Sequence, residues 1–455
     1  MPNLMTNVQP PLQFLPPDFQ PGVLKFTQWI VPWWIRLKTP ITQIDAENVE
    51  QLVELYQKFQ QEKIRFLLAF RHPNPDDPLP ISQLIWRKVP GQARKQNITL
   101  KSPVHAHFMY DRGIPLWAGN YVTWLFPKLG GTSILRGKLD RKGLKSARNL
   151  FANGRFPMAA APEGATNGLN YQVSPLEPGI AQLGFWCVED LEKAQRCEDV
   201  FIVPLGIQYH YLQENWQALA QVLGQIETDC GLTNNNSQPT PSALYPRLVN
   251  LGNYLLDLME NFYRQYYHQP IPKNTNEELP IRLQRLLDIA LQVAESYFAI
   301  QPKGSLTERC RRLEQTGWDY IYREDIKDAE SLSPVERGLA NRIAEEASLR
   351  MWHMRLVESF VAVSGKYVQE NPTFDRFAQI TIIIWTMIMR LKGGNPNRTP
   401  YLGKQRVEIT VGEPISVSQR WSDYKTNRRQ AVENLTQQLQ SSLEKMSQPQ
   451  SKPDK

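Results

Sequence analysis

The chain has 455 residues, of which 41% are hydrophobic, and its formal net charge is +7. This composition is typical of a globular protein, and the length allows more than one folded unit. The four cysteines stand apart without metal-ligand spacing, so neither a disulfide framework nor a zinc module is indicated. The positive charge favours an anionic partner, but no basic repeat or RNA-binding motif accompanies it, and nucleic acid is not expected.

The sequence predicts a cytoplasmic protein that associates with membranes at their surface. Its N-terminus lacks the basic and then apolar pattern of a signal peptide, and no apolar run reaches the ~18–20 residues of a spanning helix. Two shorter apolar segments, residues 26–38 and 380–391, have the composition of interfacial helices. Each also fits an ordinary buried helix, and the pattern alone leaves both interpretations open.

The first half of the chain alternates short apolar runs with helical patterns. Residues 1–45 are interpreted as an extended and interfacial segment, and apolar spacing over residues 45–63 predicts a helix. Strands alternating with helices predict an α/β fold with a mostly parallel central sheet over residues 46–210. The strands are expected at residues 66–70, 133–135, 156–161 and 200–203, and the further helices at 79–86, 140–152 and 180–192.

Beyond residue 210 the pattern changes to long amphipathic helices, which predicts a helical insertion over residues 211–404, entered by a loop at 234–246. Ser305 with Glu308, and Ser333 with Glu336, have the spacing of capping boxes. An alternating, β-branched segment returns at residues 405–411, and a helical pattern follows it. Because a lone strand is not stable, residues 405–447 are predicted to complete the first sheet. Residues 448–455 are predicted to be disordered.

A histidine follows the first predicted strand at the position where open α/β sheets hold their chemistry. His72 lies two residues after the apolar run 66–70, and Asp77 lies five residues further on, in a turn rich in proline. A carboxylate at this spacing can fold back, accept from one imidazole nitrogen and leave the other free as a general base. A rival pairing joins His105 or His107 to Asp111, but neither histidine has the five-residue spacing.

Four segments beside predicted strands occur in a recognisable order. Together they resemble the motifs of the glycerolipid acyltransferase family, which includes bacterial lysophosphatidic acid acyltransferases. The resemblance covers residues 25–210 and 405–446, where Gly412-Glu413-Pro414-Ile415 resembles the closing turn of the family. The four segments are Arg71-His72-x4-Asp77, Gly131-Thr132-Ser133-Ile134-Leu135-Arg136, Pro162-Glu163-Gly164 and Val203-Pro204-Leu205-Gly206-Ile207.

The resemblance implies a reaction and a set of roles. His72 would deprotonate the acceptor hydroxyl for attack on an acyl thioester, and Asp77 would orient it. Arg136 would contact a phosphate of the acceptor, since a guanidinium suits that contact. The Glu163-Gly164 pair would shape the acceptor pocket, and the Val203-Pro204 pair would line the site of the acyl chain. Read individually, Arg136 also fits a surface arginine, Glu163 a helix cap and Pro204 the end of a strand.

The implied substrates are an acyl-CoA or acyl carrier protein donor and a lysophospholipid acceptor, first of all 1-acyl-sn-glycerol-3-phosphate. No metal or other cofactor is implied. The third motif departs from the family pattern Glu-Gly-Thr-Arg-Ser, because Thr166 stands where the arginine is usual. Lys138, Arg141 or Lys142 could replace that cation. Acyl transfer to another lysolipid or alcohol, or a catalytically weak lipid-binding scaffold, therefore remains an alternative.

Overall fold

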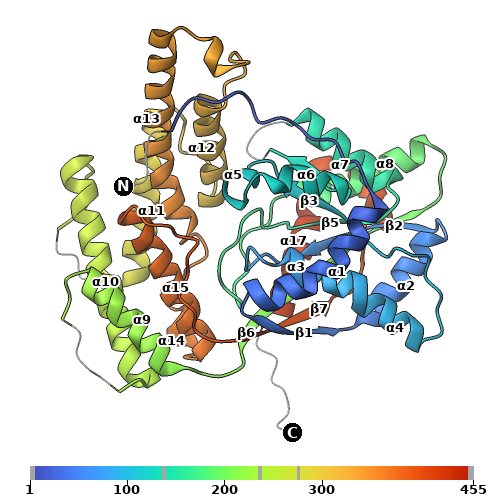
Figure 1. Cartoon of the computed structure of the whole chain (residues 1–455), viewed down its shortest axis with the longest axis horizontal. Helices are drawn as coiled ribbons and strands as arrows, with labels where there is room; N and C mark the ends of the chain where they lie inside the picture. Colours follow the sequence, from blue (N-terminus) through green and yellow to red (C-terminus); the bar gives the residue numbers. More distant parts are fainter. Residues whose placement is uncertain (1–5, 136–139, 234–237, 274–276, 449–455) are drawn as a thin grey trace. The chain divides into compact units, whose positions relative to one another are not determined.

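The computed structural model describes residues 6–135, 140–233, 238–273 and 277–448. The chain forms two compact units (Figure 1). An α/β unit consists of Phe14–Leu135, Asp140–Leu212 and the described residues from Gly403 onward. A helical unit consists of the described residues of Gln213–Leu402 together with those that precede Phe14.

An eight-stranded, mostly parallel sheet forms the centre of the α/β unit (Figure 1). Seven strands follow the order β1-β7-β6-β2-β5-β3-β4, and β8 pairs with the first part of β6. β6 is antiparallel to β7 and β8, whereas the other neighbouring pairs are parallel. The predicted α/β class with a mostly parallel sheet is confirmed. The strands are β1 (Ile41–Glu47), β2 (Ile64–Phe70), β3 (His107–Asp111), β4 (Thr132–Ile134), β5 (Met158–Ala160), β6 (Asp199–Tyr211), β7 (Gln405–Val411) and β8 (Ile415–Ser416).

β2 is buried at every position because helices cover both faces of the sheet. Phe66, Leu68 and Phe70 belong to the core beneath helices α1 to α4, whereas Leu67 and Ala69 belong to the core beneath α7, α8, α16 and α17. This explains why the strand reads as a continuous apolar run. The helices of the unit are α1 (Pro21–Lys38), α2 (Val49–Gln60), α3 (Pro78–Gln83), α4 (Val89–Lys95), α5 (Pro115–Ala118), α6 (Tyr121–Lys128), α7 (Arg141–Asn153), α8 (Gly179–Lys193), α16 (Trp421–Thr426) and α17 (Arg428–Ser447), with a π-helical turn η1 (Leu84–Lys88) between α3 and α4 and a 3₁₀ turn η3 (Ser418–Arg420) before α16.

β6 is longer than the sequence predicted. It continues past Val203 to Tyr211, so the interpretation that Pro204 ends the strand is wrong. Proline lacks an N–H donor and is tolerated in a strand where no donor is needed. The Pro204 carbonyl accepts from the Gly412 amide at 2.9 Å, so the backbone of Pro204 faces the edge of β6 that pairs with β8 and β7. Along this edge the partner of β6 changes from β8 to β7 close to Pro204. The N–H that Pro204 lacks would lie between the two pairings, where neither β8 nor β7 requires it.

The returning strand pairs as predicted. β7 is antiparallel to β6 from Leu205 to Tyr211 and parallel to β1 along the length of β1. It therefore lies between a strand from the middle of the sequence and a strand from its beginning. β1 and β3 were not predicted, and the expected boundary at residue 45 falls inside β1. Both strands are only partly buried, so neither carries a continuous apolar run.

The helical unit contains long helices, and its capping boxes at Ser305 and Ser333 are confirmed. The predicted loop 234–246 is partly wrong, because α10 begins at Pro241, while residues 234–237 lie outside the described part of the chain. The bounds are α9 (Trp216–Asp229), α10 (Pro241–Tyr266), α11 (Leu279–Tyr297), α12 (Leu306–Ile321), the 3₁₀ turn η2 (Ala329–Ser331), α13 (Pro334–Glu358), α14 (Tyr367–Glu370) and α15 (Phe374–Leu391).

The N-terminal segment is divided between the two units, contrary to the single segment 1–45 that was expected. Gln9 forms a β-bridge with Tyr322, and the Val8 amide donates to Asn341 at 3.0 Å, so this part belongs to the helical unit. The apolar segment 380–391 lies on α15, where every side chain is buried or half-buried, which favours its interpretation as core. The predicted disordered tail lies, from residue 449, outside the described residues.

Candidate active site

The end of β2 places a histidine and a carboxylate in contact at the carboxyl edge of the sheet. The Arg71 amide still donates to the Leu205 carbonyl of β6 at 2.9 Å, so strand pairing continues into the turn. Nδ1 of His72, the next residue, lies 2.9 Å from Oδ2 of Asp77. The imidazole is 22% exposed, whereas the carboxylate is fully buried. The pair expected from the five-residue spacing is therefore formed, with its histidine facing solvent.

The polarity of this contact leaves one imidazole nitrogen available. An ionised carboxylate only accepts hydrogen bonds, so Nδ1 of His72 carries the hydrogen and Nε2 presents its lone pair. Among the described residues, Nε2 has no hydrogen-bond partner. This is the arrangement of a general base, in which the hydrogen bond to Asp77 fixes the tautomer of the imidazole.

Asp77 is held by three donors that come from different parts of the unit. Its Oδ2 accepts from His72 and from the Asn74 amide at 3.0 Å, and its Oδ1 accepts from the Tyr209 hydroxyl at 2.5 Å. Burial raises the pKa of Asp77 above its ordinary value, and these hydrogen bonds act in the opposite direction by stabilising the charged form. Both carboxylate oxygens are engaged, so the side chain cannot turn away from His72.

Glu163 lies beneath the turn and is almost completely buried. Its Oε1 accepts from the His72 amide at 2.8 Å and from Nε of Arg71 at 3.3 Å. Its Oε2 accepts from the Ser174 amide at 2.8 Å and from Nδ2 of Asn167 at 3.1 Å. The interpretation as a helix cap is wrong, since the next helix begins at Gly179. Glu163 fixes the backbone that carries His72, and its part in shaping an acceptor pocket stays a prediction.

Arg71 connects three segments around the turn. Besides Glu163, its guanidinium bonds to backbone carbonyls of the loop that follows β5 and to the hydroxyl of Ser447 at the end of α17. All five N–H donors lie within reach of these acceptors, and the side chain is fully buried. The contacts are Nη1 to the Asn170 carbonyl at 2.6 Å and Ser447 Oγ at 2.9 Å, and Nη2 to the carbonyls of Leu169 at 3.1 Å and Gln172 at 2.8 Å.

The remaining expected site residues divide into three cases. Gly164 has φ of +71°, in the left-handed region that favours glycine, and its amide closes a turn on the Ala161 carbonyl at 3.3 Å. Val203 is fully buried in the core and Pro204 is buried in β6, so lining of an acyl chain by either stays a prediction. Arg136 lies outside the described residues, as does Lys138. Arg141 and Lys142 are exposed at the start of α7.

The rival histidines are structural. Nδ1 of His105 accepts from the Trp86 indole at 3.0 Å, and its Nε2 donates to the Leu129 carbonyl at 2.9 Å. Nδ1 of His107 donates to the Gly130 carbonyl at 2.8 Å, and its Nε2 accepts from the Phe156 amide at 3.3 Å. Burial lowers the pKa of each to about 4, so both imidazoles are neutral near pH 7. With all ring nitrogens occupied, neither histidine is available as a base, and the pairing with Asp111 is not formed.

Sequence reasoning missed Tyr209, which contacts Asp77, and the role of Arg71. Tyr209 lies on the part of β6 that extends beyond the end of β2. Beyond the end of β2, the side chain of Asn170 makes the two hydrogen bonds that a neighbouring strand would make to Tyr209. Its Nδ2 donates to the Tyr209 carbonyl at 2.6 Å, and its Oδ1 accepts from the Tyr209 amide at 2.9 Å. The alternation of Leu205, Ile207 and Tyr209 was the available signal, and it was lost when the strand was ended at Val203.

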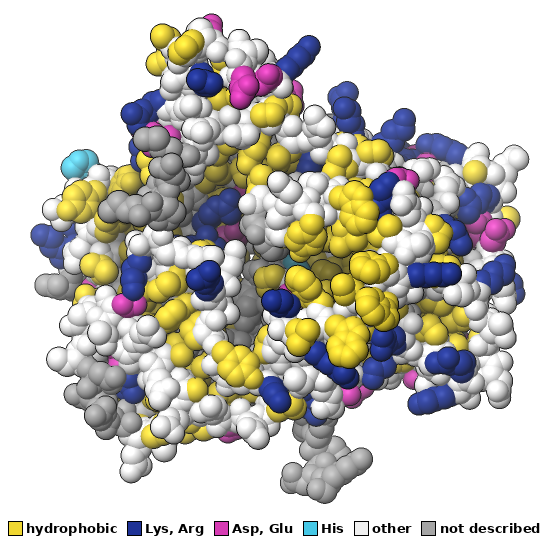
Figure 2. Space-filling model, viewed as in Figure 1, with side chains coloured by type: hydrophobic (Ala, Val, Ile, Leu, Met, Phe, Trp, Pro, Cys, Tyr) yellow, Lys and Arg dark blue, Asp and Glu magenta, His cyan; other side chains and the backbone are white. Residues whose placement is uncertain are grey.

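The tryptophan-rich helix α1 presents an apolar face to solvent. Leu24, Thr27, Val31 and Ile35 are buried, whereas the opposite face is exposed; α1 also contacts α6. In Figure 2 hydrophobic side chains gather over this helix, with lysine and arginine side chains around them. No described helix is both long and apolar enough to cross a membrane. The exposed residues are Phe26, Trp29, Ile30, Trp33, Trp34 and Leu37 on α1, Leu116 on α5, and Tyr121 and Trp124 on α6.

Among the described residues, no group of three or more His, Cys, Asp or Glu side chains is placed to bind a metal ion. No protein-family model matches the chain, and no curated protein matches it at a significant level. The chemistry of the His72 turn is therefore the basis for assigning a function.

Proposed function

We propose that the protein is an acyltransferase that moves a fatty acyl group from an acyl thioester to a hydroxyl group of a lysoglycerophospholipid. The supporting observation is the His72–Asp77 pair, a partly exposed imidazole hydrogen-bonded to a buried carboxylate at the carboxyl edge of a mostly parallel sheet. Ligands of open α/β sheets bind at this edge. The order of the four motifs adds support, and His72 is the catalytic base in this proposal.

The reaction needs one base that returns its proton. Nε2 of His72 removes the hydrogen of the acceptor hydroxyl, and the oxygen attacks the thioester carbonyl carbon. The tetrahedral intermediate collapses with breakage of the C–S bond, and the leaving thiolate takes the proton back from the imidazolium. Asp77 stabilises the imidazolium while it exists. The products are an ester and a free thiol, and the enzyme regains its starting state.

The first acceptor to test is 1-acyl-sn-glycerol-3-phosphate, because the chain has a net charge of +7 and exposed cations at the start of α7. Arg141 and Lys142, together with Arg136, are the proposed phosphate contacts in place of the arginine that Thr166 replaces. Acyl-CoA and acyl carrier protein are both anionic, so either suits the same charge as donor. Comparison of acceptors with and without a phosphate tests whether the acceptor carries one.

The proposal is tested by measuring thiol release and ester formation by the purified full-length protein. Acyl-CoA and acyl carrier protein thioesters are offered with lysophosphatidic acid, other lysophospholipids and long-chain alcohols. We expect ester formation with at least one lysophospholipid, dependent on both substrates, and faster with the phosphate monoester than with the alcohol. Binding of lysophospholipid without product from any donor would overturn the enzyme assignment and favour the scaffold.

We further propose that the exposed face of α1 holds the protein on an anionic membrane surface. Tryptophan side chains are enriched at the membrane–water interface. The exposed Lys25, Arg36 and Lys38 of α1, which has no acidic residue, would attract anionic lipid. Replacing Trp29, Trp33 and Trp34 together with serine should abolish co-flotation with vesicles that contain an anionic phospholipid. The fold should survive, because these three side chains are about half exposed or more.

A matched triple variant provides the control. Tyr266, Leu339 and Tyr401 are as exposed as the tryptophans but belong to the helical unit. Their replacement with serine should leave flotation unchanged. Equal flotation of the tryptophan variant and the wild type, with unchanged circular dichroism, would exclude α1 as the membrane contact.

A further inference from the structure

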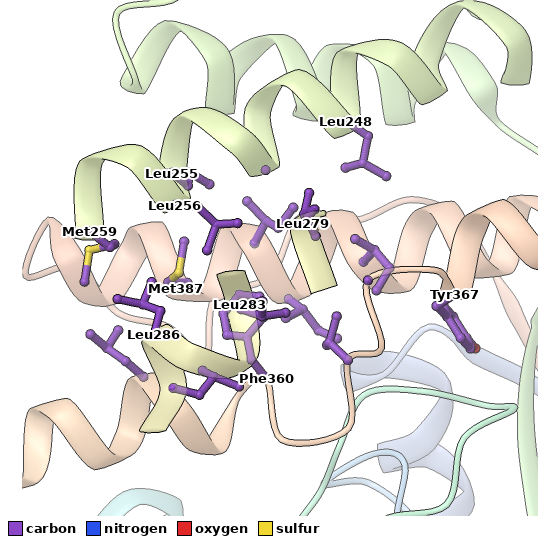
Figure 3. Close-up of a pocket in the computed structure, with 18 of the residues that line it drawn as sticks. Leu248, Leu255, Leu256, Met259, Leu279, Leu283, Leu286, Phe360, Tyr367 and Met387 are labelled. Atoms are coloured by element: carbon purple, nitrogen blue, oxygen red, sulfur yellow. The ribbon is translucent and has the colours of Figure 1, made fainter. Parts of the chain in front are cut away.

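The helical unit contains an apolar cavity that is separate from the His72 site. Its volume is about 140 Å³, and it is partly open to solvent. Figure 3 shows the labelled side chains arranged lengthwise, from Met259 and Met387 at one end to Tyr367 at the other. The lining comes from α10, α11 and α15 and from the chain between the end of α13 and α14.

The lining specifies an apolar occupant. It contains no charged side chain, and its members are mainly leucine, isoleucine, valine and methionine. Two of its hydroxyls are already used, because Tyr263 bonds to Nδ1 of His353 at 2.8 Å and Tyr367 donates to Gln379 at 2.6 Å. A cavity of this size with an aliphatic lining stays dry and accepts hydrocarbon. Close-packed interiors seldom keep such a space empty, since its walls forgo their van der Waals contacts.

The spread of the lining residues from Met259 to Tyr367 favours a chain over a compact ring (Figure 3). Flexible methionine and leucine side chains adapt to a bent alkyl chain, and methionine in particular fills irregular gaps. On α15 the lining residues Ile380, Ile383, Ile384 and Met387 follow one helical stripe. By helical spacing this stripe continues one turn further to Arg390, which follows Met387 on α15 and is not itself one of the lining residues.

Arg390 supplies a group that an anionic end of the ligand would satisfy. Its Nε is buried and has no hydrogen-bond partner among the described residues. Burial and the charge of Arg355 lower the pKa of Arg390, so a nearby anion would be favourable for both guanidinium groups. The carboxylate of Glu358 acts in the opposite direction and raises the pKa of Arg390, but it also bonds to Arg311 at 2.9 Å, so several cations share this one carboxylate.

We propose that the helical unit binds one long-chain anionic lipid, with its hydrocarbon chain along this cavity and its carboxylate or phosphate at Arg390. This site is distinct from the acyl-transfer site and does not depend on the chemistry of His72. Free fatty acid and lysophospholipid share the required chemistry, a single chain with an anionic end. The helical unit then has a function of its own as a lipid-binding unit.

The test measures binding of cis-parinaric acid, a fluorescent long-chain fatty acid, to the full-length protein. The wild type should bind it saturably. Leu283→Trp, which fills the cavity, should weaken binding about tenfold or more. Ile281→Trp, on the exposed side of the same helix, should not change it. If Leu283→Trp does not fold, Ala290→Leu fills less space and serves the same purpose. Unchanged binding by a folded cavity variant, or none by the wild type, would overturn the proposal.

Two further comparisons separate the parts of the proposal. Arg390→Gln should weaken binding of the fatty acid about tenfold, because the substitution removes the cation that contacts the carboxylate. Competition by the matching long-chain alcohol should stay unchanged, because the alcohol has no charge. Equal weakening for both would overturn the assignment of Arg390. His72→Ala should bind the probe like the wild type, so failure of the acyltransferase proposal is distinguished from failure of this one. Competition by lysophosphatidic acid and by unlabelled fatty acid then ranks the two lipid sources.

Discussion

Replacing His72 with alanine is expected to lower the turnover of acyl transfer by about a thousandfold, within the range that a general base contributes. The side chain lies at the surface of the turn, and the turn is held by backbone contacts to Glu163 and by Asp77, so the fold should survive. Initial rates of thiol release at saturating substrate give the effect, and thermal unfolding shows whether the protein is intact.

His268 provides the control for this variant, because it is an exposed histidine in the helical unit. His268→Ala should turn over substrate at the rate of the wild type. The assignment of the base would be wrong if His72→Ala kept near wild-type activity while a folded His107→Ala variant lost it. The bonds of both His107 ring nitrogens lead us to expect the reverse.

Replacing Arg71 with methionine should lower the free energy of unfolding of the α/β unit by about 3–5 kcal/mol, the usual cost of breaking a buried ion pair by removing one partner. The methionine leaves the Glu163 carboxylate buried without its cation and four further acceptors without a donor. Arg71→Lys keeps the charge but not the planar set of five donors, so its loss should be intermediate. Urea unfolding followed by circular dichroism measures both variants.

Arg94→Met is the matched control, because Arg94 is an exposed arginine on α4 of the same unit. Its unfolding midpoint should stay close to that of the wild type. An unchanged midpoint for Arg71→Met would mean that the buried guanidinium does not hold the turn, the loop after β5 and α17 together. Loss of activity without loss of stability in Arg71→Met would point instead to a direct part in substrate binding.

The parts of the site that the sequence predicted are those encoded locally. His72 and Asp77 are five residues apart and follow an apolar strand, so the pattern brings them together without knowledge of the rest. The contact of Tyr209 with Asp77 spans 132 positions, and that of Arg71 with Ser447 spans 376. No short pattern records such contacts, because they follow from strand register and from the docking of a distant helix.

The fold shows the same division. β2 and β7 were predicted because full burial and strict alternation each leave a clear pattern. β1 lies at the edge of the sheet and is buried mainly at Ile41, so its sequence has no apolar periodicity. The extension of β6 past Pro204 was hidden because proline usually ends a strand, and here the change of partner from β8 to β7 removes the conflict.

The antiparallel pairing of β6 with β7 has a consequence for synthesis of the chain on the ribosome. The two strands are adjacent in the sheet, yet the whole helical unit is translated between them. Domains fold as they emerge, so the helical unit can form while the sheet still lacks β7 and its covering helix α17. Ser447, the partner of Arg71 at the His72 turn, is made only after the helical unit. The contacts around the His72 turn are therefore completed only after β7 and α17 have been made, and a chain that stops within the helical unit carries all four motifs without these contacts.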